Sequence, residues 1–267
     1  MQKKEKYQIV YLSHGGGPLP ILGDPSHKAM IEFMKNLPQL LIKPELIIVI
    51  SAHWEEDIPT IIGESEPELF YDYYGFPQQA YELKYPAKGS SESAKKVLDM
   101  LEENGIQGKI DLERGFDHGM FIPLKLMYPN ADIPCIQISL IKGLDASLHI
   151  EMGKALKKIL NGKTLILGSG FSYHNIMAFF EQRDNSTDTR NDEFQDWLIE
   201  TTTGNISQDE RENRLINWEK APNARYCHPR EEHLLPLHVC AGLAGKEGDI
   251  VFDDKILGKR GIAVTWL

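Results

Sequence analysis

Nine histidines are spread through the 267-residue chain, and the positions of three of them suggest chemistry. His14 follows the run QIVYLS, His53 follows LIIVISA, and His174 follows TLILGSG after a short turn. These runs predict buried strands, and in open α/β sheets ligands bind where the carboxyl ends of the strands lie. Gly or Ser residues lie close to each of these histidines in the sequence, and glycine lets the backbone approach a bound ion or substrate closely. We therefore expect a shared metal site at this edge of the sheet.

Two further histidines belong to this candidate site, His233 near the start of the last predicted helix and His118 in the glycine-flanked segment Gly115–Gly119. Imidazole suits Zn, Fe and Cu. Without a cysteine cluster a structural zinc site is disfavoured, which leaves a catalytic ion with an open coordination position. The other histidines are expected on the surface or in packing roles, the first two in predicted helices far from this edge: His27, His149, His228 and His238.

The elements that must position these residues are predicted from short β-branched runs and amphipathic stretches. The predicted strands are Gln8–Leu12, Leu46–Ser51, Pro59–Ile62, Ile133–Leu140, Thr164–Leu167 and Ile262–Trp266. The predicted helices are Asp24–Leu37, Ser90–Asn104, Asp145–Leu160, Asp188–Thr202, Asp209–Trp218 and Glu231–Leu243. Their alternation predicts an α/β fold: one three-layer domain over residues 1–267 with a central mixed, largely parallel sheet flanked by helices. The polar stretch Glu181–Thr189 is interpreted as a loop rather than a domain boundary.

The charge and the hydropathy of the sequence argue against nucleic acids and membranes as binding partners. The net charge is −10, from 29 Lys and Arg against 39 Asp and Glu, which disfavours nucleic acid. No apolar run approaches the ~20 residues of a membrane span, and the N-terminus lacks a signal-type apolar segment, so we expect a cytoplasmic protein with no membrane partner. The widely spaced Cys135, Cys227 and Cys240 are expected to be buried thiols rather than a disulfide framework or a metal site.

Seven short motifs strengthen the argument because they occur in order along the chain. They are Ser13–Pro18 (SHGGGP), Ser51–Trp54 (SAHW), Gly75–Pro77 (GFP), Tyr81 with Tyr85–Gly89 (YPAKG), Gly115–Gly119 (GFDHG), His174-Asn175 and Glu232–Leu237 (EHLLPL). Together they resemble the class III extradiol ring-cleavage dioxygenases, and most closely the 4,5-DOPA dioxygenase-like subgroup. The resemblance extends from about His14 to Gly245.

The resemblance implies one divalent ion per chain, Fe(II) when active and often Zn(II) as isolated. It implies His14, His53 and His233 as metal ligands and His174 as the acid/base residue, with His174 also able to become a fourth ligand to zinc. It implies that His118 lines the substrate and oxygen side of the pocket. Because classical members use a glutamate as third ligand, Glu232 remains an alternative to His233.

The implied activity is extradiol cleavage of a catechol-type, DOPA-like ring with O2, and a homo-oligomer is compatible with the sequence. Aromatic walls for the ring are expected from Trp54, Phe76, Tyr81 and Tyr173. Relatives often have His-Gly-Ser-Pro where this chain has His14-Gly-Gly-Gly-Pro18, so the first ligand loop is one residue longer and can reshape the pocket mouth. Two other functions remain open: a zinc-dependent hydrolase and a non-catalytic metal-binding scaffold.

Overall fold

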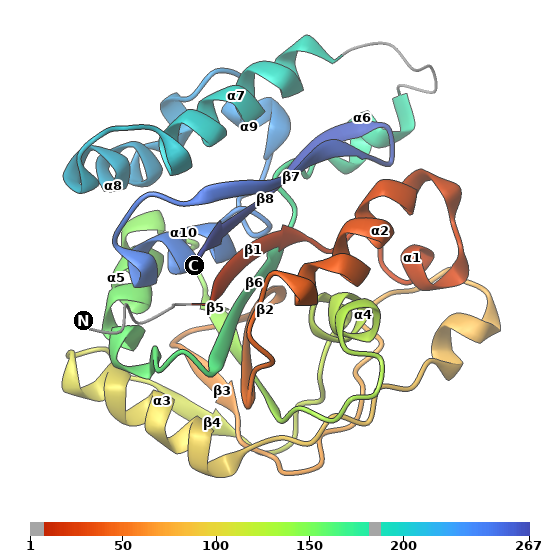
Figure 1. Cartoon of the computed structure of the whole chain (residues 1–267), viewed down its shortest axis with the longest axis vertical. Helices are drawn as coiled ribbons and strands as arrows, with labels where there is room; N and C mark the ends of the chain where they lie inside the picture. The colour runs from red at the N-terminus through yellow and green to blue at the C-terminus, as the bar shows by residue number, and fades with distance from the viewer. Residues whose placement is uncertain (1–7, 182–187) are drawn as a thin grey trace.

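One eight-stranded sheet organises the protein (Figure 1), in a computed structural model that describes residues 8–181 and 188–267. The strand order across the sheet is β4-β3-β5-β2-β6-β1-β8-β7. The strands are β1 Ile9–Ser13, β2 Leu46–Glu56, β3 Thr60–Ile62, β4 Lys109–Asp111, β5 Cys135–Ile141, β6 Thr164–Gly170, β7 Asp249–Ile256 and β8 Lys259–Trp266.

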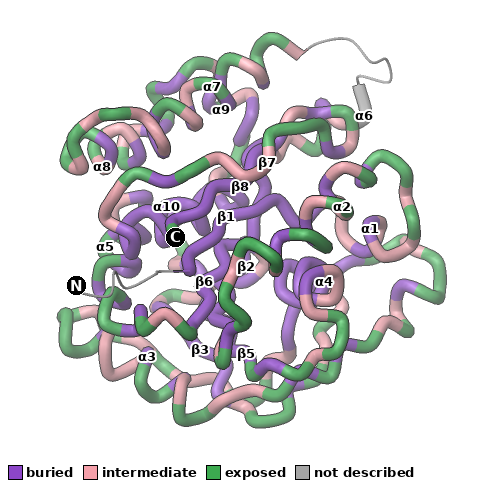
Figure 2. The backbone as a smooth tube through the Cα atoms, in the orientation of Figure 1, coloured by how far each residue is buried: buried purple, intermediate pink, exposed green. Residues whose placement is uncertain are grey.

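The centre of the sheet is parallel and its margins are mixed. Strands β5, β2, β6 and β1 run parallel, whereas β8 pairs antiparallel with β1 and β7, and β3 pairs antiparallel with β5. The central strands are rich in Ile, Leu and Val and are buried on both faces, as Figure 2 shows. The predicted mixed, largely parallel α/β sheet is therefore confirmed.

Helices cover both faces of the sheet. Helices α5 and α10 pack on one face, and α2 and α4 lie on the other (Figure 1). The α-helices are α1 Leu19–Leu22, α2 Lys28–Asn36, α3 Ser91–Glu103, α4 His118–Met127, α5 Ala146–Ala155, α6 Ile176–Glu181, α7 Thr189–Thr203, α8 Gln208–Ile216, α9 Ala224–Cys227 and α10 Leu235–Ala244. Short 3₁₀ turns are η1 Pro25–His27, η2 Leu37–Gln39, η3 Gln78–Glu82, η4 Leu156–Ile159 and η5 Trp218–Lys220.

All twelve predicted elements correspond to observed ones, with shifted ends, but strands β4 and β7, helix α4 and the short helices α1, α6 and α9 were not predicted. Helix α4 is almost wholly buried and contains Pro123, so it has no amphipathic pattern to detect. Strand β7 is an edge strand with a single buried residue, and β4 has only three residues. Strand β2 continues past the predicted end at Ser51 to Glu56, with a register shift between Ile50 and Glu55.

Three smaller expectations can be compared with the structure. The loop predicted over Glu181–Thr189 falls mainly on residues 182–187, outside the described residues, while its ends belong to α6 and α7. The three cysteines are free and buried, as expected. Among the described helices, none combines the length and apolar character needed to cross a membrane.

Candidate metal centre

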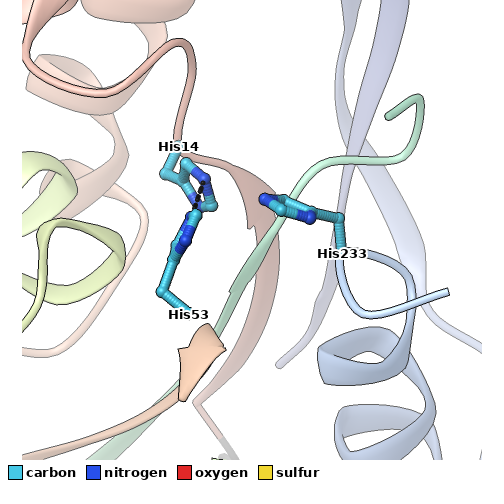
Figure 3. Close-up of side chains that lie close together, drawn as sticks. All are labelled: His14, His53 and His233. Carbon is cyan, nitrogen blue, oxygen red and sulfur yellow. Dashed lines mark hydrogen bonds between the residues drawn. The ribbon is translucent and has the colours of Figure 1, made fainter. Parts of the chain in front are cut away.

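Parallel strands bring the separated histidines to one edge of the sheet. His14 is the first residue after β1, and its N–H donates to the Gly170 carbonyl at the end of β6, 3.0 Å away. The sequence predicted that His53 follows the end of its strand, but it lies inside β2. It still lies beyond Ser51, the last residue of β2 that pairs with β6. His233 lies in the turn before α10. Figure 3 shows that the imidazoles of these three residues point toward one another.

Glycines permit the close approach of these segments. A Cβ on Gly170 would lie 2.0 Å from the His233 carbonyl oxygen, so only glycine lets the turn before α10 contact the end of β6. A Cβ on Gly119 would lie 2.5 Å from Ser51 Oγ and 3.2 Å from the His53 ring. The close backbone approach expected from the sequence glycines is thus required by the packing around the histidines.

The groups next to each Nδ1 indicate which nitrogen of the three imidazoles carries the proton. His14 Nδ1 lies 3.1 Å from Ser169 Oγ and His233 Nδ1 lies 2.9 Å from Glu232 Oε1, both within hydrogen-bond distance. His53 Nδ1 lies 3.5 Å from Asp72 Oδ2, which is an ion-pair distance rather than a hydrogen bond. The Ser169 hydroxyl donates to the Gly119 carbonyl, so toward His14 it accepts, as the two carboxylates also do. His14 and His233 therefore carry their proton on Nδ1 and keep a lone pair on Nε2. The negative charge of Asp72 near His53 Nδ1 favours the same form of His53.

The Nε2 atoms converge in a way that fits a divalent cation. The Nε2 atoms of His14 and His53 lie 3.0 Å apart (dashed line in Figure 3), and the ring centroids of His14 and His53 lie 5.3 and 4.8 Å from that of His233. Two imidazole nitrogens at this separation either share a proton as a hydrogen bond or hold a cation between them. Ligand atoms of these three residues all lie within 4.8 Å of one another. Imidazoles oriented through Nδ1 by an acceptor are the usual arrangement of metal-binding histidines.

Electrostatics keep these imidazoles neutral, which metal binding requires. Burial lowers the pKa of His14, His53 and His233 well below the ordinary value of histidine. The neighbouring histidines lower these pKa values further, because a second positive charge nearby disfavours protonation.

Two carboxylates connect the cluster to the remaining site histidines. His118 donates from its backbone N–H and its Nδ1 to Asp72 Oδ1, at 3.0 and 2.8 Å, and His174 Nδ1 donates to Glu232 Oε1 at 3.0 Å. The His174 ring stacks on His233 with centroids 3.4 Å apart. Burial alone would raise the pKa of Asp72 and Glu232 and is the largest single effect, but the hydrogen bonds from His118 and His174, together with nearby positive charge, outweigh it and lower both pKa values.

All five site histidines open into one cavity of about 430 Å³. This volume is typical of a small-molecule site. The remaining lining is glycine and apolar side chains: Gly15, Gly16, Gly17, Leu19, Tyr73, Phe76, Phe171, Ile176, Phe179 and Leu257. Of the four aromatic walls predicted from the sequence, Phe76 lines the cavity and the other three do not.

The other three predicted walls are used elsewhere in the structure. Trp54 packs its face against the Arg114 guanidinium, 4.8 Å from the ring centroid. Tyr81 lies behind Tyr73, and Tyr173 is buried behind Phe179. Aromatic residues near a motif are numerous in this chain, and the sequence alone does not distinguish those that face the cavity from those in the layer behind.

His27 was expected to lie far from the site, and this prediction is wrong. The 3₁₀ turn η1 folds back beneath the first ligand loop, where the fully buried His27 accepts a hydrogen bond at Nε2 from the Gly16 N–H, 3.0 Å away. Its Nδ1 lies 3.0 Å from Asp24 Oδ1. The other three outlying histidines are buried and bonded to backbone groups, in packing roles: His149, His228 and His238.

Several residues of the site were not found from the sequence. Asp72 and Ser169 orient imidazoles, and Tyr73 and Leu257 line the cavity. Asp72 stands alone among aromatic residues in a segment without periodicity, and Ser169 lies between two glycines at a strand end. An isolated polar residue in such surroundings is the signal that could have indicated them. Leu257 carries no such signal, because only the fold brings it to the site.

A cavity lined by histidines at the strand ends of an α/β sheet is typical of metal-dependent enzymes. Sequence comparison identifies the family of such enzymes. Residues 8–262 match the family described as the catalytic LigB subunit of aromatic ring-opening dioxygenase. The chain belongs to this family, and it is an extradiol-type dioxygenase. The resemblance inferred from the seven motifs is confirmed.

Similar proteins support the same class. Dioxygenase tasH of Hapsidospora irregularis is 39% identical over 94% of this chain and 82% of its own length. The 4,5-DOPA dioxygenase extradiol of Beta vulgaris is 37% identical over 90% of this chain and 87% of its own length. The crystal structure of an uncharacterized protein from Escherichia coli K12 superposes with a TM-score of 0.78 at 25% identity and covers 97% of this chain and 99% of its own.

Proposed function

We propose that this protein opens a catechol-type ring with O2 at a single Fe(II) ion held by His14, His53 and His233, within one catalytic domain spanning the chain. The observation that carries this proposal is the convergence of three buried, neutral imidazoles, of which His14 and His233 are hydrogen-bonded through Nδ1 and His53 faces the Asp72 carboxylate. In this arrangement Glu232 accepts a hydrogen bond from His233 Nδ1, which favours His233 over Glu232 as the third ligand. A bound Fe(II) would hold the diol and O2 together and mediate electron transfer between them.

His174 is proposed as the acid/base residue. Its Nδ1–H donates to Glu232, so its Nε2 carries the lone pair, and the residue lines the cavity. A diol hydroxyl within hydrogen-bond reach would transfer its proton to this Nε2, and the adjacent carboxylate would stabilise the resulting imidazolium. The same nitrogen can return the proton to the product.

His118 is proposed to position the substrate. Asp72 holds its ring through Nδ1, which leaves Nε2 as an acceptor at the cavity wall. It would accept a hydrogen bond from the substrate on the side away from His174. Tyr73 and Phe76 stand beside it, with ring centroids 5.5 Å apart, and offer an apolar surface for an aromatic ring.

The test is anaerobic loading with Fe(II), then addition of a panel of catechols that includes DOPA, because a relative is a 4,5-DOPA extradiol dioxygenase. We expect stoichiometric oxygen uptake at an electrode and a yellow ring-opened semialdehyde. Ester or amide hydrolysis by the zinc-loaded protein without oxygen, and no oxygen uptake with iron, would replace this proposal with the zinc hydrolase. The sequence-based expectation of a cytoplasmic location is part of the proposal and is tested by cell fractionation.

A further inference from the structure

A leucine in an unusual backbone conformation lies at the mouth of the cavity. Leu257 and Gly258 form the tip of the β7–β8 hairpin, with φ of 54° and 79°. A two-residue hairpin turn in which both residues have a positive φ usually has the sequence Asn-Gly. A leucine in the first of these positions is strained, because a positive φ is unfavourable for a bulky side chain. The Leu257 N–H donates to the Ser26 carbonyl, 3.2 Å away, which ties the hairpin tip to the turn beneath the first ligand loop.

The side chain of Leu257 rests on the extended glycine loop. A Cβ on Gly16 would lie 3.1 Å from Leu257 Cδ1 and 3.3 Å from Leu19 Cδ1, so both leucines contact the bare backbone of this loop. His27 also holds that backbone, through the hydrogen bond from the Gly16 N–H. Leu19, Gly16 and Leu257 also line the cavity that holds the site histidines.

The chemistry of this wall favours one kind of ligand group. Among the described residues that line the cavity, no side chain is a Lys, Arg, Asp or Glu. A carboxylate or ammonium group buried against Leu19 and Leu257 would lose water without gaining a partner, whereas an alkyl group would gain by leaving water.

We propose that Gly16, Leu19 and Leu257 form a subsite for an uncharged, apolar substituent on the aromatic diol, and that Leu257 sets the size of the substituent accepted. The inference deepens the proposed function, on which it rests for the position of the ring. With the two hydroxyls at the histidine end of the cavity, a ring substituent extends toward the hairpin tip. Gly16 contributes by letting the side chains of Leu19 and Leu257 pack against its backbone.

The test measures binding rather than turnover, by calorimetry on the Fe(II)-loaded protein under argon. The probes are 4-propylcatechol, 3,4-dihydroxyphenylacetate and DOPA. We expect the wild type to bind 4-propylcatechol at least about tenfold more tightly than either charged probe. Leu257→Ala should weaken 4-propylcatechol binding about tenfold and leave the charged probes within about twofold. Leu257→Lys should reverse the preference toward 3,4-dihydroxyphenylacetate.

Two further variants keep the test informative if a hairpin variant folds poorly. Gly16 lacks a positive φ, so Gly16→Ala adds a methyl group to the subsite without backbone strain, and it should weaken 4-propylcatechol but not unsubstituted catechol. Leu144 also has a positive φ, 52°, and does not line the cavity, so Leu144→Ala is the matched control and should leave all affinities unchanged.

The outcomes separate this inference from the proposed function. Equal affinity for all three probes, or equal weakening of all three by Leu257→Ala, would overturn the subsite. Selective binding of 4-propylcatechol with no oxygen uptake on admission of air would support the subsite and overturn the ring-opening proposal. Oxygen uptake, together with tighter binding of DOPA than of 4-propylcatechol, would support the ring-opening proposal and overturn the subsite.

Discussion

At the scale of single residues, the site depends as much on hydrogen-bond acceptors as on imidazoles. Glu232 Oε1 accepts from both His174 and His233, at 3.0 and 2.9 Å, and Asp72 serves His118 in the same way. A histidine without such an acceptor can rotate or change tautomer, and its Nε2 is then no longer directed at the ion. We therefore propose that orienting the imidazoles is one role of both carboxylates.

Replacing Glu232 with Ala should weaken metal binding about 10- to 100-fold, because His233 loses the acceptor that directs its Nε2. The affinity is measured by competition with a chromophoric chelator. Glu231→Ala is the matched control, since Glu231 pairs with Arg225 instead. Unchanged affinity in Glu232→Ala would contradict the orienting role.

Replacing His174 with Ala should lower kcat by about 10²–10⁴-fold while the metal stays largely bound, because a general base is lost but the three proposed ligands remain. Oxygen uptake and metal content are measured on the same sample. His228→Ala serves as a control, because His228 bonds the Ser172 carbonyl and does not line the cavity. Normal turnover in His174→Ala would remove the assignment of this base.

At the scale of elements, helix α10 determines where His233 lies, and glycines determine where α10 lies. A Cβ on Gly242 would lie 2.2 Å from the Ile150 carbonyl oxygen, and one on Gly153 would lie 2.1 Å from the Val239 carbonyl oxygen. Helices α5 and α10 thus touch backbone to backbone. On the sheet side, a Cβ on Gly168 would lie 2.8 Å from the Pro236 carbonyl oxygen, so α10 is held close on both sides.

Gly242→Ala should destabilise the protein by about 1–3 kcal/mol, because the new methyl group meets rigid backbone and the helices must separate. The free energy of unfolding is measured by urea denaturation. Leu148→Ala on the outer side of α5, where Leu148 is 51% exposed, is the control and should change it little. A Gly242→Ala protein as stable as the wild type would show that the two helices are not in close contact.

At the scale of the whole molecule, the fold buries many histidines in the neutral state. Burial lowers the pKa of His238 to about 4 and that of His228 to about 3. The unfolded chain has histidine pKa values of about 6.5. The stabilising effect of the neutral form is therefore complete above pH ~6.5 and decreases as the pH falls toward the folded-state values, because the unfolded state binds protons that the folded state does not.

The metal-free protein should accordingly lose stability between pH 6.5 and 5, by about 1.4 kcal/mol per pH unit for each such histidine. Urea denaturation in the presence of a chelator measures the dependence. His238→Gln, which keeps a donor for the Leu215 carbonyl, should reduce the slope by the contribution of one proton. A wild-type stability that does not change over this range would contradict the burial of neutral histidines.

The sequence by itself determined the features that depend on neighbouring residues in the chain, namely the regular strands and helices and the histidines next to them. Runs such as LIIVIS predicted central strands, because a strand buried on both faces must be continuously apolar. A histidine that follows such a run in the chain must lie near the edge of the sheet where the strand ends. The order of the motifs was enough to indicate the family. Helix α4 and strand β7 were missed because full burial and edge exposure each remove the periodicity on which such predictions rest.

Only the tertiary structure decided which distant residues meet. It brought His27 beneath Gly16, Asp72 to His118 and Leu257 to the cavity mouth, across separations in the chain of 11, 46 and more than 200 residues. It also determined which aromatic side chains face the cavity and which stand behind them. Such contacts depend on the packing of whole elements, and a residue's type and its neighbours in the chain carry no information about a partner supplied by another element.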